Sequence, residues 1–151
     1  MTKVTQYSFA HKIIWMNENG EIHRDDGPAV ITEDGEMFWY KNGMRHREDG
    51  PAFIDPYGCK YWYKNGAQHR DDGPAAECVT GWKVWYKNGD IHRDDGPAME
   101  HPSGSKSWYK NGQLHRTDGP AIEGPNGEKV WFLNGKKMSE SKWKRAVEQE
   151  D

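Results

Sequence analysis

Histidine and aspartate recur together in this chain at a fixed spacing. The phrase His-Arg-x-Asp-Gly-Pro-Ala occurs five times, and its histidines follow one another at intervals of 23 residues: His23, His46, His69, His92 and His115. A histidine beside a carboxylate is a common pair for general acid–base catalysis. An active site, however, is normally one asymmetric group of residues in a pocket, and here every copy offers the same set. We therefore predict that the protein is not an enzyme.

The repeated polar residues are better explained as a structural ladder. The aspartate before Gly-Pro can accept backbone N–H groups in an Asx-type turn. The arginine can pair with carboxylates of adjacent repeats, and the histidine can pack at a strand end. The central members of this predicted ladder are His46, Arg47, Asp49, His69, Arg70, Asp72, His92, Arg93 and Asp95. Binding of a small anion by the same residues is the alternative.

Calcium binding is the other chemistry that adjacent carboxylates suggest. A calcium ion takes about six to eight oxygen ligands, but the neighbouring side chains of Asp25 and Asp26 point in different directions, and Arg24 adds positive charge. Thr117 replaces the first acid in the last copy. The sequence also has no phosphate-binding loop, nucleophile elbow or HExxH motif. It therefore predicts neither a bound metal nor a cofactor.

A tryptophan ladder is the better candidate for binding. The phrase Trp-Tyr-Lys-Asn-Gly occurs four times, and in three of the copies lysines flank the tryptophan on its own side of the strand. Aromatic rings beside cations can stack on bases or bind anions. The candidate binding residues are Trp39, Trp62, Trp85, Trp108, Lys64 and Lys87. The alternative is that these side chains only cover the solvent-facing side of a thin sheet.

Departures from the repeat mark a second candidate contact site. Tyr57 and Trp82 add aromatic rings beside two mid-repeat turns, where Cys59 and Cys78 also stand. We predict that Tyr57 and Trp82 contact a partner, with simple turn variation as the alternative. The two cysteines form no CxxC pair, so we expect reduced thiols rather than a disulfide or a zinc site.

Three turns punctuate each repeat. Asn-Gly predicts a type I′ hairpin, because both of its central residues need a positive φ. A mid-repeat glycine predicts a second turn, and Asp-Gly-Pro predicts a third, in which glycine again permits a positive φ. The runs between the turns are rich in Val, Ile, Phe, Tyr and Trp and suit strands. The sequence therefore predicts an all-β fold, an elongated single-layer antiparallel meander of 23-residue β-hairpin repeats.

The repeats occupy most of the chain. We assign residues 1–138 to the repeat array, about five and a half repeats long, and residues 139–151 to a C-terminal capping helix. The first repeat is degenerate and has Met16 where the others have tryptophan. Ser139 can cap the helix, and Trp143 and Val147 can pack on the last repeat.

Strand alternation separates two faces of the predicted sheet. One face carries aromatic and aliphatic residues such as Phe38 and Tyr61, and we expect it to be buried. The other carries the tryptophans and lysines and is expected to face water. Across the mid-repeat turns we expect three charge pairs: Glu77–Lys83, Glu100–Lys106 and Glu123–Lys129.

Bulk composition excludes several classes of function. The net charge is −3, with both signs interspersed, whereas a nucleic-acid binder needs a basic footprint. No run approaches the roughly 20 apolar residues of a membrane span, and the N-terminal segment lacks the apolar core of a signal peptide. We expect a cytoplasmic protein that binds neither nucleic acid nor a membrane.

The segment from Trp62 to His69, Trp-Tyr-Lys-Asn-Gly-Ala-Gln-His, resembles the W-x-N-G-K-x-H-G core of MORN repeats. The resemblance extends over about residues 13–135. MORN repeats continue with H-G-x-G, whereas this chain has H-R-x-D-G-P-A, a variant similar to arrays of bacteriophage and large-virus proteins. The resemblance implies an elongated antiparallel sheet that serves as a scaffold or docking surface. Lipid binding, attributed to some MORN proteins, is disfavoured by the acidic balance of this chain.

These observations predict a non-enzymatic protein-interaction or scaffold module. If the viral association holds, the protein is a phage or viral protein that docks on a host defence protein in the host cytoplasm. The alternative is a small-molecule binding protein that sequesters a nucleotide signal in a groove lined by arginine and tryptophan. The sequence leaves the oligomeric state open, with an edge-paired dimer as one arrangement.

Overall fold

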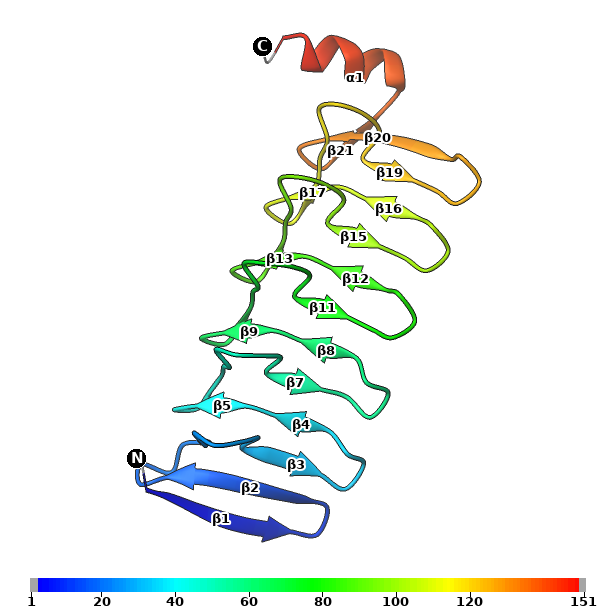
Figure 1. The fold of residues 1–151 in the computed structure, drawn as a ribbon. Helices are drawn as coiled ribbons and strands as arrows, with labels where there is room; N and C mark the ends of the chain where they lie inside the picture. Colours follow the sequence, from blue (N-terminus) through cyan, green and yellow to red (C-terminus); the bar gives the residue numbers. More distant parts are fainter. Residues whose placement is uncertain (1–2, 150–151) are drawn as a thin grey trace.

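In the computed structural model, which describes residues 3–149, short antiparallel strands form a long open sheet with a helix at its C-terminal end (Figure 1). The main sheet has thirteen strands, arranged side by side in chain order. The predicted all-β meander, elongated and one layer thick, is confirmed.

The main sheet consists of β1 (Val4–Phe9), β2 (Lys12–Asn17), β3 (Val30–Thr32), β4 (Met37–Phe38), β7 (Phe53–Ile54), β8 (Lys60–Tyr61), β11 (Ala76–Glu77), β12 (Lys83–Val84), β15 (Met99–Glu100), β16 (Lys106–Ser107), β19 (Ile122–Glu123), β20 (Lys129–Leu133) and β21 (Lys136–Met138). Four small hairpins lie beside it: β5 (Tyr40–Lys41) with β6 (Met44–Arg45), β9 (Tyr63–Lys64) with β10 (Ala67–Gln68), β13 (Tyr86–Lys87) with β14 (Asp90–Ile91), and β17 (Tyr109–Lys110) with β18 (Gln113–Leu114). The helix is α1 (Glu140–Val147).

The small hairpins continue the main sheet across a break at each tryptophan. The Trp39 N–H donates to the Ala52 carbonyl at 2.8 Å, and the His46 N–H donates to the Trp39 carbonyl at 3.1 Å. The same pair of bonds recurs at Trp62, Trp85 and Trp108. Each repeat therefore adds one strand pair to the main sheet and one small hairpin beside it.

Two of the three predicted turns have the expected backbone. In the five regular repeats the asparagines of the Asn-Gly turns have φ between 49° and 52°, and the following glycines are also at positive φ, as a type I′ turn requires. Asn19 of the first repeat does not adopt a positive φ, although Gly20 does. The mid-repeat glycines, such as Gly81 at 95°, are positive too.

The prediction of positive φ for the Asp-Gly-Pro glycines is wrong, because none of these five residues adopts it. These positions hold glycine because the neighbouring arginine leaves too little room for a side chain. A Cβ placed on Gly96 would lie 3.1 Å from the Arg93 guanidinium carbon.

The strand register places opposite charges side by side. The three predicted pairs across the mid-repeat turns are confirmed, Glu77 being paired with Lys83 and the other two in the same way. The ladder also continues between repeats, where Lys60 pairs with Glu77 and Lys83 with Glu100. Acid and base thus alternate from strand to strand between β8 and β20.

Both faces of the sheet contribute to the core, so the expectation of one buried and one wet face is only half right. On the aromatic face Val84 is fully buried, while Phe38 and Phe53 stack with ring centroids 4.4 Å apart and stay half-buried. The alanine of each Asp-Gly-Pro-Ala phrase is fully buried as well. Because Ala52 precedes Phe53 in the chain, it points to the opposite face, beside the tryptophans.

The first repeat uses Trp15, and the alignment of Met16 with the repeat tryptophan is wrong. The Trp15 N–H donates to the Ala29 carbonyl at 2.8 Å, as each repeat tryptophan does one repeat later. The turn after Trp15 is one residue longer than Lys-Asn-Gly, which hides the equivalence in the sequence.

The C-terminal helix covers the last repeat. Its N-cap is Ser139, as predicted, whose side chain accepts a hydrogen bond from the Lys142 N–H. Trp143 is buried, with its ring 4.5 Å from the ring of Trp131, and its Nε1–H donates to the Arg116 carbonyl at 2.8 Å. Within residues 3–149, no helix is long and apolar enough to span a membrane.

Candidate interaction surface

Each repeat tryptophan carries an arginine on its ring. The guanidinium carbon lies 3.8–4.3 Å from the ring centroid in five pairs: Arg24 on Trp15, Arg47 on Trp39, Arg70 on Trp62, Arg93 on Trp85 and Arg116 on Trp108. This is the geometry of a cation–π contact. One face of each of these rings is therefore already occupied by the protein's own arginine.

The same arginines close the Asp-Gly-Pro loops. Arg47 donates from Nε to Asp49 at 2.8 Å and from Nη1 to the Pro51 carbonyl at 3.4 Å. The other four arginines make the same two bonds in their own loops. These hydrogen bonds, followed by the positive charge of the arginine, lower the pKa of Asp26, Asp49 and Asp95.

The aspartates therefore pair mainly with arginine side chains rather than with the Asx-turn amides that we expected. Three arginines also reach a carboxylate on a strand of the main sheet, Arg70 to Glu77 at 3.9 Å, Arg93 to Glu100 at 3.4 Å and Arg116 to Glu123 at 2.8 Å. The arginine thus ties its loop to the tryptophan, and in these three repeats to the main sheet.

The histidines link successive repeats. The Nδ1 atom of His46 accepts the Asn65 N–H at 3.0 Å, and the other four histidines accept the amide of the asparagine one repeat later. Since Nδ1 is the acceptor, the ring proton lies on Nε2. At His46 that nitrogen is 2.8 Å from Glu48, and the hydrogen bond lowers the pKa of Glu48.

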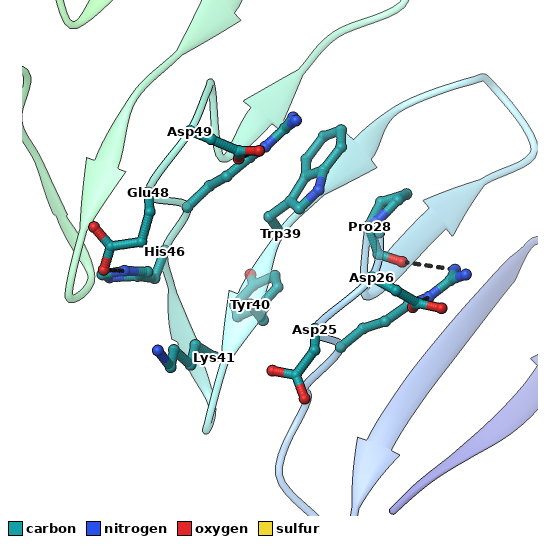
Figure 2. A pocket seen from close by; sticks show the side chains of 12 residues that line it. Asp25, Asp26, Pro28, Trp39, Tyr40, Lys41, His46, Glu48 and Asp49 are labelled. Atoms are coloured by element: carbon teal, nitrogen blue, oxygen red, sulfur yellow. Dashed lines mark hydrogen bonds and ion pairs between the residues drawn. The ribbon is translucent and has the colours of Figure 1, made fainter. Parts of the chain in front are cut away.

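Four grooves lie between successive loops. The first has a volume of about 670 Å³ and is lined by Asp25, Trp39, Tyr40, His46 and Glu48, among others (Figure 2). The other three have equivalent linings one, two and three repeats further along. The carboxylates are outermost, because the Asp49 side chain is 82% exposed and that of Arg47 only 26%. Lys64 lies 3.9 Å from Asp71 in the second groove.

A second surface lies at two adjacent mid-repeat turns. Cys59 and Cys78 form a disulfide with a Cα–Cα distance of 4.1 Å, so the expectation of reduced thiols is wrong. The bond joins the β7–β8 turn to the β11–β12 turn. Tyr57 on the first turn and Val79 on the second are each 83% exposed, while Trp82 is half-buried. We call Tyr57, Val79, Trp82 and the disulfide the central turn cluster.

Two features that were not predicted, the arginine–tryptophan contacts and the disulfide, nevertheless have a signal in the sequence. Arginine follows tryptophan by eight residues in every regular repeat, with Asp-Gly-Pro two residues later. Cys59 and Cys78 are the next pair in the ladder that joins Lys60 to Glu77, so the register predicts that they lie opposite each other.

No group of three or more His, Cys, Asp or Glu side chains that could hold a metal ion occurs among residues 3–149. In comparisons with known proteins, no family model matches the chain and no curated protein is significantly similar to it.

Proposed function

We propose that this protein is a non-enzymatic protein-interaction module whose partner docks on the central turn cluster. The observation that carries the proposal is the exposure of Tyr57 and Val79, 83% each, on two turns joined by a disulfide. Tyrosine is one of the residue types enriched among the energetic hot spots of protein interfaces. A cross-linked pair of turns also loses little conformational freedom on binding.

The central turn cluster contains residues that differ from those at the equivalent positions of the other repeats. The position of Tyr57, directly before the turn glycine, is held by Asp34, Thr80, Ser103 and Asn126 in the other repeats. Folding of the turn therefore does not require an aromatic ring there. Val79 lies beside the Tyr57 turn, its Cγ1 atom 3.7 Å from a Cβ placed on Gly58, and adjacent exposed apolar side chains of this kind indicate an interaction site.

The Trp–Arg–Asp units and the histidines act, in this proposal, as the frame that holds the turns. They bind one another, which leaves fewer free donors for a ligand. The alternative function, sequestration of a nucleotide signal, has weaker support, because exposed carboxylates such as Asp49 and Asp72 line the grooves and repel phosphate.

The MORN resemblance supports the same class of function, and from it we propose a viral protein with a host partner. The cytoplasmic location is a proposal as well. The disulfide weighs against it, since disulfides persist mainly in oxidising compartments.

Site-specific photo-crosslinking in an extract of the native host tests the proposal. A photoreactive phenylalanine analogue replaces Tyr57 in one protein and Asn126, the equivalent position of the last repeat, in a control. A partner cross-linked at 57 and not at 126 is then identified, purified and titrated. The double variant Tyr57→Ala/Val79→Ser should raise the Kd at least about tenfold, while Asn126→Ala should leave it unchanged. An unchanged Kd for the folded double variant would refute the docking site.

A further inference from the structure

Within residues 3–149, no strand pairs with the outer side of β1, the first strand of the sheet. β1 stands at the end of the strand order and pairs only with β2 among the residues that the structure describes. It is six residues long, Val-Thr-Gln-Tyr-Ser-Phe, and all but Val4 are exposed. The strand contains no charged residue and no proline, the features by which proteins usually prevent an edge from pairing.

The backbone pattern shows which groups face outward. The Trp15 N–H donates to the Ala29 carbonyl and the Glu33 N–H to the His11 carbonyl, so the odd-numbered residues of β2 bond toward β3. Its even-numbered residues then bond toward β1, because antiparallel partners alternate in direction. Since Lys12 pairs with Phe9, the odd residues of β1 bond inward. Val4, Gln6 and Ser8 are left with outward N–H and C=O groups.

These outward groups are self-complementary. In an antiparallel pair of two β1 strands centred on Gln6, each Gln6 faces the other Gln6 and each Val4 faces the other copy's Ser8. All three outward residues of both strands then exchange hydrogen bonds. Shifting the centre by one residue, to Thr5 or Tyr7, leaves one of the three unpaired. The centred register also places the two Tyr7 rings, each 46% exposed, diagonally across the pair, within reach of aromatic contact.

The opposite edge of the sheet does not offer such a template. β21 carries Lys136 and Lys137 and is followed directly by the N-cap of α1. Lysine on an edge strand disfavours pairing. Pairing of β1 with β21, which would produce an open fibre, is therefore disfavoured relative to a closed twofold dimer.

We propose that β1 pairs with β1 of a second copy of this chain, antiparallel and centred on Gln6, so that two molecules form one continuous sheet. The inference is independent of the central turn cluster. It accounts for a long, neutral edge strand in a molecule whose inner strands are mostly two residues long.

Charge at position 6 tests both the dimer and its register, because residue 6 faces itself only in this arrangement. Light scattering of the wild-type chain should show twice the chain mass of 17.5 kDa at micromolar concentration. Gln6→Lys and Gln6→Glu should each weaken the dimer roughly fivefold, because like charges then lie directly opposite. An equimolar mixture of the two variants should form the mixed dimer in preference to either homodimer, as native mass spectrometry can quantify.

Thr80→Lys is the matched control, an exposed position far from β1, and should leave the dimer intact. Circular dichroism verifies that each variant is folded. A monomeric wild-type chain would overturn the proposal, even if β1 were found to pair with a strand of a different protein. Dimers that tolerate either charge at position 6, or no preference for the mixed dimer, would overturn the register and with it the proposed pairing.

Discussion

Replacing Gly96 by alanine tests why the Asp-Gly-Pro turns contain glycine. Alanine should stabilise the fold if only backbone entropy matters, and should destabilise it if glycine is there to leave room for Arg93. Gly96 has no left-handed φ, so backbone entropy alone predicts that alanine stabilises the fold by about 0.4–1 kcal/mol. The added Cβ, however, would lie 3.1 Å from the Arg93 guanidinium carbon. That guanidinium is held between Gly96 and the Trp85 ring, 4.0 Å from the ring centroid, and has little room to move.

The expected loss outweighs the expected gain. A displaced Arg93 gives up a cation–π contact worth about 0.5–2 kcal/mol. It also strains the hydrogen bonds to Asp95 and to the Pro97 carbonyl. Water replaces part of these contacts, so we expect Gly96→Ala to destabilise the protein by about 1–2 kcal/mol, within the range of a methyl group added to a filled site. For a chain of this length the melting temperature should fall by roughly 2–8 °C.

A double-mutant cycle provides the control. In an Arg93→Ala background the obstruction is gone, so Gly96→Ala should be neutral or raise the melting temperature slightly. Thermal unfolding followed by circular dichroism measures all four proteins. A rise in melting temperature on Gly96→Ala alone, or the same fall in both backgrounds, would refute the steric role of this glycine.

Three further outcomes follow from the structure. Reducing the disulfide, or the variant Cys59→Ser, should destabilise the protein by about 3 kcal/mol, because the bond joins residues 19 apart in the sequence and so restricts the unfolded chain. Thermal unfolding with and without reductant measures this effect. Equal melting temperatures in the two conditions would contradict it. Trp143→Ala should expose the last repeat, because the Trp143 ring packs on Trp131 and donates a hydrogen bond to the Arg116 carbonyl. The rate of amide hydrogen exchange should then increase in β19–β21 and not in β7–β8. A uniform increase along the chain would argue against a local capping role of the helix. The melting temperature should fall below about pH 4, since the lowered pKa values of Asp49, Glu48 and Asp95 stabilise the fold above their unfolded pKa. This stabilisation is lost as the pH falls through the folded pKa. Asp95→Asn should flatten the acid limb of a plot of melting temperature against pH, and an unchanged acid limb would contradict the pairing with Arg93.

Local chemistry explains which structural predictions succeeded. Asn-Gly needs positive φ at two residues and allows little besides a tight hairpin. A fixed period with no insertion keeps every strand in the same register, so the pairing of Glu77 with Lys83 follows from counting residues. These features depend only on neighbours within one repeat.

The predictions that failed all depend on contacts between segments. The role of Gly96 is set by Arg93 and Trp85, which a turn rule does not include. The longer first turn moves the tryptophan role from Met16 to Trp15. The central turn cluster forms because two turns of neighbouring repeats lie side by side, although Tyr57 and Trp82 stand out in the sequence.

By itself, then, the sequence determined the repeat, two of its three turns, the strand register within each repeat and the capping helix, because each follows from backbone preferences over a few residues. Only the tertiary structure decided how the repeated polar residues are used. Arginine lies on tryptophan, histidine joins successive repeats, and Cys59 meets Cys78 because stacking the repeats brings side chains from different turns within contact distance. The same stacking leaves one end of the sheet, β1, with its backbone groups facing outward.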